Sequence, residues 1–216
     1  MMQGLSAQAL IQSIIIIVIS LTVHEFAHSL AAIALGDETP RKQGRLTLNP
    51  LAHIDLVGFI LLVVAGFGWA KPVMFNPANL KKPRRDEILI SVAGPFSNLV
   101  FAMLGVIIVW AVLSTHALVS AAANSAFGGF MIQFVAINVS LAVFNMIPIP
   151  PLDGSHLVTV FLGRVNSTLA ATYFRYGSFA LLAIILFQSI TRIEILPISR
   201  LTYAVVRAMF HLVSIG

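Results

Sequence analysis

The stretch from Ala7 to Leu35 reads AQALIQSIIIIVISLTVHEFAHSLAAIAL and contains no Lys or Arg. About 20 mainly apolar residues suffice to cross a bilayer as a helix, so this stretch predicts a membrane-spanning helix. His24, Glu25 and His28 interrupt it as the motif HEFAH. Histidines four residues apart lie on one helix face, and with a carboxylate beside them they are suited to hold zinc and activate water. Because polar groups at membrane depth are costly and usually functional, the motif indicates metal chemistry within a membrane.

The composition is that of an integral membrane protein. Of the 216 residues, 58% are hydrophobic and 10% are charged, whereas a soluble domain typically has about 25% charged residues. The absence of cysteine excludes thiolate metal sites, disulfides and cysteine nucleophiles, and it leaves His, Asp and Glu as metal ligands. Most basic residues fall in two connecting segments, 41–45 and 71–85, which is typical of cytoplasmic loops. We therefore expect the lipid bilayer as a partner and no nucleic acid.

Four long apolar segments predict transmembrane helices, and two further segments are ambiguous. The long segments cover residues 7–35, 88–114, 127–149 and 169–190. A shorter, glycine-containing stretch covers 56–70, and the tail at 195–215 carries basic residues, so the tail is either a last span or an interfacial helix. The sequence predicts an all-α polytopic membrane protein with about five to six transmembrane helices and a re-entrant or membrane-edge segment near 40–70.

The charge distribution predicts which side of the membrane each connection faces. The segments on either side of residues 56–70 carry eight basic residues, whereas the connection 115–126 carries none. By the positive-inside rule both flanks of 56–70 lie in the cytoplasm, so this stretch dips into the membrane and returns; a short true span is the alternative. Residues 1–13 lack the basic start of a signal peptide, so we expect the first span to be retained in a protein of the cell membrane.

A catalytic zinc site needs a third protein ligand and keeps one position open. The stretch PIPPLDG at 148–154 follows an apolar span, and its prolines break the helix, so that Asp153 is able to reach a cavity. We therefore expect Asp153 to join the two histidines of the HEFAH motif, with the glutamate of that motif moving a proton from water to the leaving amine. Capping of a following helix is the alternative role for Asp153, and His156 is the nearest rival ligand.

Three blocks of this sequence resemble elements of the site-2 protease family, the intramembrane zinc metalloproteases of peptidase family M50. They are HEFAH at 24–28, GPFSN at 94–98, which is similar to the family's Gly-Pro-x-x-Asn element, and NMIPIPPLDG at 145–154, which is similar to its Asn…Pro…Leu-Asp-Gly element. The stretches GRLTLNP at 44–50, HID at 53–55 and GWAKPV at 68–73 also resemble one subgroup. The resemblance covers roughly residues 20–156, and the chain is similar to a compact form without a PDZ or CBS domain.

This resemblance implies a function and a set of site residues. It implies that His24, His28 and Asp153 hold Zn²⁺, that Glu25 is the general base, and that Asn145 stabilises the oxyanion or orients the substrate. Hydrogen bonding between helices is the alternative role of Asn145. The implied substrates are transmembrane proteins, cut in or near their membrane segments toward the cytoplasmic side. The chain 1–216 would be one metalloprotease domain, with a catalytic core at about 7–156 and accessory helices at about 157–216.

Two other functions use some of the same residues. His and Asp inside a membrane also mark ion paths, so a divalent-cation transporter is one alternative, and a catalytically inactive membrane scaffold is the other. Glu25 discriminates between them, because only a protease needs it as a proton shuttle. A substrate helix has to unwind for cleavage, and we expect it to add a strand beside residues 40–55 or 71–77. The sequence predicts no oligomeric state.

Four further polar residues and one aromatic residue have structural interpretations. Asn98 is expected to support helix packing rather than chemistry. His53 and Asp55 are expected either near the active site or in a loop-capping or interfacial role. Trp69 and Lys71 are expected to anchor the chain at the membrane interface, and contact with the substrate is their alternative role.

Overall fold

The computed structural model describes residues 6–65, 68–114, 126–191 and 193–214, and in this part of the chain the regular structure is helical. Four helices are long and apolar enough to cross a membrane. They are α1 (Ala7–Ala34), α4 (Pro83–Ser114), α6 (Ala126–Asn145) and α8 (Ser167–Thr191). The expectation of an all-α integral membrane protein is therefore confirmed, but the described residues contain four helices of this kind, whereas the sequence predicted about five to six transmembrane helices.

The remaining helices are shorter. They are α2 (Thr39–Lys42), α3 (Leu56–Ala65), α7 (Gly154–Val165), α9 (Ile198–Ser214) and the 3-10 turns η1 (Pro50–Ala52) and η2 (Pro77–Asn79). Two of these helices, α3 and α9, lie in the segments 56–70 and 195–215, for which the sequence did not decide whether the chain crosses the membrane. The ten residues of α3 extend about 15 Å, half of a bilayer core. The 17-residue α9 buries Met209 against the other helices, whereas its Arg200 side chain is 80% exposed.

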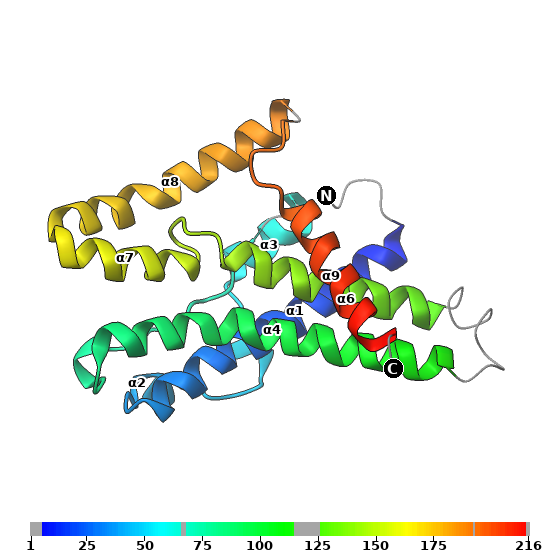
Figure 1. The fold of residues 1–216 in the computed structure, drawn as a ribbon, viewed down its shortest axis with the longest axis horizontal. Helices are drawn as coiled ribbons and strands as arrows, with labels where there is room; N and C mark the ends of the chain where they lie inside the picture. The colour runs from blue at the N-terminus through cyan, green and yellow to red at the C-terminus, as the bar shows by residue number, and fades with distance from the viewer. Residues whose placement is uncertain (1–5, 66–67, 115–125, 192, 215–216) are drawn as a thin grey trace.

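The centre of the molecule is formed by α1, α4 and α6, and α9 packs across the outside of α6 and α4 (Figure 1). Small and β-branched residues let these helices approach closely. The shared core contains Ala102 and Val106 of α4, Val135 and Val139 of α6, and Met209 of α9. Helices α7 and α8 form a hairpin that contacts the bundle through α7 and α4 (Figure 1).

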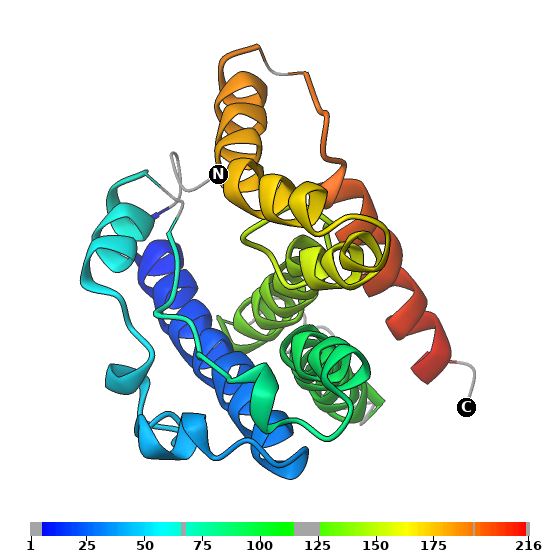
Figure 2. The same cartoon turned by 90° about the vertical axis from the view of Figure 1, so that its left-hand side faces the viewer.

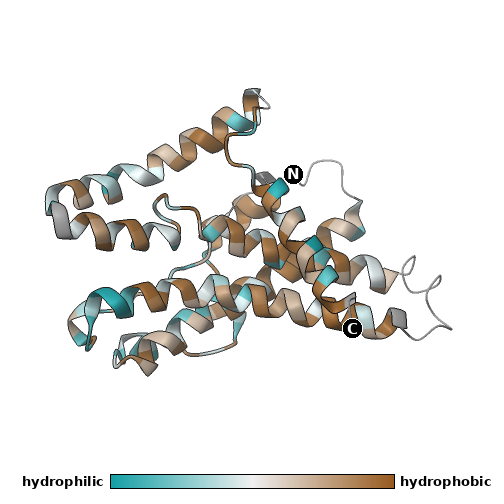
Figure 3. Cartoon of the chain, viewed as in Figure 1, coloured by the Kyte–Doolittle hydropathy of each residue, from teal (hydrophilic) through white to brown (hydrophobic). Residues whose placement is uncertain are grey.

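The distribution of polar groups is the reverse of that in a soluble protein. Large apolar side chains of α1, among them Ile11, Ile15 and Ile19, are exposed, whereas His24 and Glu25 of the same helix are buried. Figure 3 shows mainly apolar residues along the long helices and hydrophilic residues at the end where α4 begins. An apolar exterior of this kind is typical of a protein surrounded by lipid.

The ends of the helices are determined by local chemistry. Helix α1 ends where Gly36 adopts a φ of +107°, and the Asp37 N–H donates to Ala32 O at 2.9 Å. Glycine is suited to this left-handed position because it lacks a Cβ. The apolar run 127–149 leaves the helix earlier than its hydropathy indicates, since α6 ends at Asn145 and prolines follow at 148, 150 and 151.

The two ends of the stretch that contains α3 lie next to each other. An antiparallel bridge pairs Ile54 with Ala70, and the Lys71 N–H donates to His53 O at 2.8 Å. The Asp55 carboxylate accepts from the Gly58 N–H at 2.8 Å, so Asp55 has the loop-capping role at the start of α3. Figure 2 shows α2, η1 and α3 flanking α1 on the side away from α9.

Candidate metal centre

Helix α1 presents two buried imidazoles on one face, as the four-residue spacing predicts. The rings of His24 and His28 are almost perpendicular, at 83°, and their centroids lie 4.6 Å apart. Their Nε2 atoms are 3.0 Å apart. Both side chains face α4, because α1 and α4 pack against each other along the site.

Asp153 joins this pair from the connection between α6 and α7. Its Oδ2 atom lies 3.0 Å from His24 Nε2, and its Oδ1 atom lies 3.4 Å from His28 Nε2. One ligand atom from each of the three residues lies within 4.8 Å of the others, so the group could hold a metal ion. The Asp153 side chain makes no capping hydrogen bond to α7, so the alternative capping role is not seen.

The hydrogen bonds around the histidines favour a cation among these three residues. His24 Nδ1 lies 2.7 Å from Asn98 Oδ1, and His28 Nδ1 lies 2.7 Å from Ile90 O. Because both partners are acceptors, each Nδ1 carries the proton and each Nε2 keeps its lone pair. Two lone pairs and a carboxylate therefore converge, and Asp153 Oδ2 is buried without a hydrogen-bond donor. Two imidazole nitrogens and one carboxylate are a donor set that suits Zn²⁺.

A glycine in α4 provides the space for this group. A Cβ placed on Gly94 would lie 2.4 Å from His28 Nε2 and 2.5 Å from His24 Nε2. Any side chain at this position would therefore occupy the region where the ligand atoms meet. Asn98 follows one helical turn later and hydrogen-bonds to His24. The GPFSN block thus combines room for the centre with an acceptor for one of its ligands.

Glu25 lies beside the histidines and contacts an extended segment of the chain. It is 8% exposed, and its Oε2 accepts from the Val73 N–H at 3.1 Å. The guanidinium of the buried Arg45 holds the same segment, donating to Lys71 O at 3.2 Å and to Pro72 O at 3.3 Å. Arg45 also donates to the carbonyl of Ala52, which joins the segment to the loop after α1.

Asp37 holds the other end of that segment. Its carboxylate accepts from the Asn76 N–H at 2.6 Å, from Asn79 Nδ2 at 2.7 Å, and from the N–H and hydroxyl of Thr39 at 3.1 and 2.6 Å. Burial alone would raise the pKa of Asp37, but these hydrogen bonds outweigh it and lower the pKa below its usual 3.8. Asp37 is therefore an anion at neutral pH, and together with Arg45 it keeps Val73 against Glu25.

Comparison with known proteins assigns the family. The family model described as Peptidase family M50 matches residues 12–118 and 111–188. The chain belongs to peptidase family M50. This membership makes it a homologue of zinc metalloproteases and identifies zinc as the metal that suits His24, His28 and Asp153.

The M50 chain is similar to curated relatives from several bacteria. It is 42% identical over 145 residues to the Bacillus subtilis (strain 168) protein named "Putative zinc metalloprotease YwhC". This match covers 67% of this chain and 66% of that protein. It is 34% identical over 141 residues to Rip2 of Mycolicibacterium smegmatis and 35% identical over 142 residues to Rip2 of Mycobacterium tuberculosis. These matches cover 62% and 63% of this chain but 51% of each Rip2 protein. No solved structure matches the chain.

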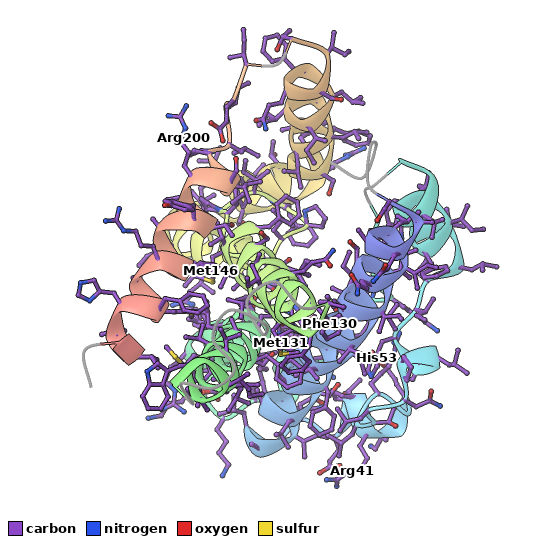
Figure 4. All side chains as sticks on the ribbon, turned by 90° about the vertical axis from the view of Figure 1, so that its right-hand side faces the viewer. Arg41, His53, Phe130, Met131, Met146 and Arg200 are labelled. Atoms are coloured by element: carbon purple, nitrogen blue, oxygen red, sulfur yellow. The ribbon has the colours of Figure 1, made fainter. Side chains whose placement is uncertain are left out.

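Several residues that the sequence singled out in this M50 chain are not members of the metal group, which consists of His24, His28 and Asp153. Asn145 Nδ2 donates to Leu141 O of its own helix at 3.0 Å. His156, the rival ligand, lies 2.9 Å from Glu87 Oε1 and is not in the metal group. His53 is buried in the loop region with its Nε2 2.8 Å from Thr47 O, and Trp69 is 47% exposed. Figure 4 shows His53 on the α1 side of the molecule, with Arg41 and Arg200 directed away from the bundle.

The structure also reveals roles that sequence reasoning missed. Asn98 does more than the expected helix packing, because it accepts a hydrogen bond from His24 of the candidate metal group. Arg45 and Asp37 were not singled out at all. The available signals were weak: Arg45 lies in the GRLTLNP block, and Asp37 directly follows the glycine that ends α1.

Proposed function

We propose that this protein is an intramembrane zinc endopeptidase, which hydrolyses peptide bonds in or near the transmembrane segments of other proteins. The observation that carries the proposal is that His24, His28 and Asp153 come together beside Glu25. The two histidines and Glu25 lie on α1, a helix long enough to cross the bilayer. His24 lies ten residues before the end of α1, which is about 15 Å along the helix axis. The chemistry would therefore take place at membrane depth.

The charge pattern supports an active site that opens toward the cytoplasm. Helix α2, which carries Arg41 and Lys42, and the start of α4, which carries Arg84 and Arg85, lie at the same end of the molecule (Figure 1). In our proposal this end faces the cytoplasm, and α3 dips into the membrane without crossing it. The pairing of Ile54 with Ala70 supports the dip, because it brings both ends of the α3 stretch to one place.

Glu25 is the residue we assign to proton transfer. Its Oε2 is engaged by the Val73 N–H, and Oε1 has no hydrogen-bond donor among the described residues, so Oε1 would accept the proton from water. The same carboxyl would then donate that proton to the leaving amine. Zinc, when bound by the two histidines and Asp153, supplies a Lewis acid that polarises the scissile carbonyl and lowers the pKa of water.

Asn145 is proposed to stabilise the oxyanion or orient the substrate. It stands at the end of α6, eight residues before Asp153. One N–H of its amide donates to Leu141 O. The second N–H would then be the donor to the substrate.

We propose that the substrate binds in extended form beside residues 71–77. The alternative stretch, 40–55, contains α2 and η1 and is less suited to pair with a strand. Residues 71–76 have no helical structure, and Met74 is 61% exposed. Because Val73 contacts Glu25, a strand added along this edge would bring its backbone to the proposed base and metal.

A cleavage assay with matched variants tests the proposed function. The purified protein would be placed in liposomes with a model transmembrane substrate, and wild type would be compared with Glu25→Gln and His24→Ala. Loss of a general base typically costs about 10²–10⁴-fold, so Glu25→Gln should lose that much cleavage while it keeps its zinc. His24→Ala should lose both cleavage and zinc. Glu38→Gln, an equivalent change at an exposed glutamate paired with Arg41, is the control and should cleave normally.

Other outcomes would support the alternatives. Full cleavage by Glu25→Gln would exclude the proposed proton transfer. A wild-type protein that moves zinc across the liposome membrane without cleaving would be a transporter. A protein that does neither, while it retains its fold and zinc, would fit a scaffold.

A further inference from the structure

A chain of buried amides leads from α6 to one of the two ligating histidines. Asn98 of α4 and Asn138 of α6 are both fully buried. Asn98 Oδ1 accepts from His24 Nδ1 at 2.7 Å, while Asn98 Nδ2 donates to Ser20 O at 3.2 Å and to Asn138 Oδ1 at 3.1 Å. Helices α1, α4 and α6 therefore meet in one continuous hydrogen-bond network.

Each amide in this chain has only one satisfactory orientation. Asn138 Nδ2 donates to Phe134 O at 2.9 Å, which leaves Asn138 Oδ1 as the acceptor toward Asn98. Asn98 must then direct its NH₂ group toward Asn138 and Ser20, since a flipped amide would place its oxygen against two acceptors. Asn98 Oδ1 is consequently the atom that faces His24, and the His24 proton belongs on Nδ1.

The second histidine does not depend on a side chain in this way. His28 Nδ1 lies 2.7 Å from the backbone carbonyl of Ile90, a group that can only accept. The tautomer of His28 is therefore set by the main chain, whereas the tautomer of His24 depends on two amide side chains. An imidazole with its proton on Nε2 cannot bind a metal ion through that atom.

We infer that Asn98 and Asn138 form a relay that holds His24 in its Nδ1-protonated tautomer and thereby sets the zinc affinity of the centre. Asn138 is a positioning residue in this relay, acting through Asn98. The inference deepens the metal site on which the proposed function rests, but it concerns zinc binding alone and requires no cleavage. It assigns to α6 a part in the centre beyond carrying the chain to Asp153.

A neighbouring amide provides a matched control for simple helix packing. Gln133 of α6 also reaches α1, donating to Ser13 Oγ at 2.6 Å and to Ala9 O at 3.3 Å. It lies on the same helix as Asn138, but it links α6 to α1, whereas Asn138 links α6 to α4, and its hydrogen bonds do not lead to His24. If amides between helices merely hold the helices together, substitutions at 133 and 138 should have equivalent effects.

The test measures zinc affinity in the full-length protein, with zinc alone as the probe. Asn98→Leu, Asn138→Leu and Gln133→Leu would be titrated against a chelator of known affinity. Loss of an outer-shell partner typically weakens metal binding about 10–100-fold, so Asn98→Leu should approach the upper value and Asn138→Leu the lower one. Gln133→Leu should bind zinc as wild type does. The double variant of Asn98 and Asn138 should be no weaker than Asn98→Leu, because Asn138 acts through Asn98.

A spectroscopic measurement separates the relay from general destabilisation. The ¹⁵N chemical shifts of the His24 ring in the metal-free protein report its tautomer, and in Asn138→Leu they should move toward the Nε2-protonated form. If leucine prevents folding, as judged by circular dichroism, Asn138→Ala takes its place. Wild-type zinc affinity and an unchanged His24 tautomer in a folded Asn138 variant would overturn the inference. An equal loss of affinity in Gln133→Leu would overturn it as well.

Discussion

A single methyl group added at Gly94 should remove zinc binding while leaving the helices formed. The added carbon would lie 2.4 Å from His28 Nε2, about 1 Å closer than the 3.4 Å at which ordinary contact begins. Zinc–nitrogen bonds are about 2.0–2.1 Å long, and binding sites tolerate deviations of about 0.2 Å. A displacement of about 1 Å is several times that tolerance, whether the imidazoles move or α4 moves.

The magnitude follows from comparison with milder changes. Loss of an outer-shell partner costs up to about 100-fold in metal affinity, and intrusion among the ligand atoms should cost at least as much, or about 2.8 kcal/mol. The effect on folding should be small by comparison. Overpacking costs about 1–3 kcal/mol, and alanine is favoured over glycine inside a helix by about 1 kcal/mol.

Three other glycines serve as controls for Gly94→Ala. A Cβ on Gly129 or Gly163 would meet nothing within 4 Å, so alanine at either position should bind zinc normally. A Cβ on Gly105 would lie 2.8 Å from Val135 Cγ2, in the packed contact between α4 and α6 and not against the histidines. Gly105→Ala should therefore lower thermal stability without changing zinc affinity.

The assay is a competition titration of zinc against a chelator, with circular dichroism to confirm the helices. Gly94→Ala should be folded and bind zinc at least about 100-fold more weakly than wild type. A folded Gly94→Ala protein with wild-type zinc affinity would refute the placement of the metal between α1 and α4. A loss of affinity in Gly105→Ala as large as in Gly94→Ala would show that crowding of α4, not intrusion at the centre, is responsible.

Three further predictions concern the segment beside Glu25 and the metal itself. Arg45→Met should reduce cleavage without changing zinc affinity, because the substitution frees the carbonyls of Lys71 and Pro72 but alters no metal ligand. A cleavage assay and a zinc titration on the same variant check this prediction, and unchanged cleavage would contradict it. Asp37→Asn should lower the melting temperature at neutral pH. Because folding lowers the pKa of Asp37, the difference in melting temperature between wild type and Asp37→Asn should be complete above about pH 3.8. That difference should disappear as the pH falls through the folded-state pKa. A melting-temperature difference that persists in strong acid would argue against that assignment. Removal of zinc by a chelator should lower the melting temperature of wild type but not of His24→Ala. The reason is that a ligand present at 100 times its Kd stabilises the folded state by about 2.7 kcal/mol. Scanning calorimetry of both proteins with and without chelator measures the effect.

Residues that are neighbours in the chain were sufficient to predict much of the protein. The length of the apolar runs predicted the four long helices, because crossing a bilayer depends on local hydropathy and helical rise. The four-residue spacing of His24 and His28 predicted a shared face, because helical periodicity is local. Asp153 was predicted as a ligand because the prolines before it break α6, and the structure brings it to the histidines.

Other features depended on which surfaces meet in three dimensions. Gly94 and Asn98 were recognised only as part of the GPFSN block, and Asn138 has no distinctive local pattern. The roles of all three follow from the packing of α1, α4 and α6. The extended segment at 71–76 is held by Arg45 and Asp37, which precede it in the chain by up to 39 residues. The HEFAH sequence thus specified which atoms can bind zinc, and the proline-rich block before Asp153 indicated the third ligand. The tertiary structure decided which hydrogen-bond partners the histidines have and how much space surrounds them. The physical reason is that helical periodicity and hydropathy act over a few residues, whereas the hydrogen bonds and close contacts that complete the centre join helices distant in sequence.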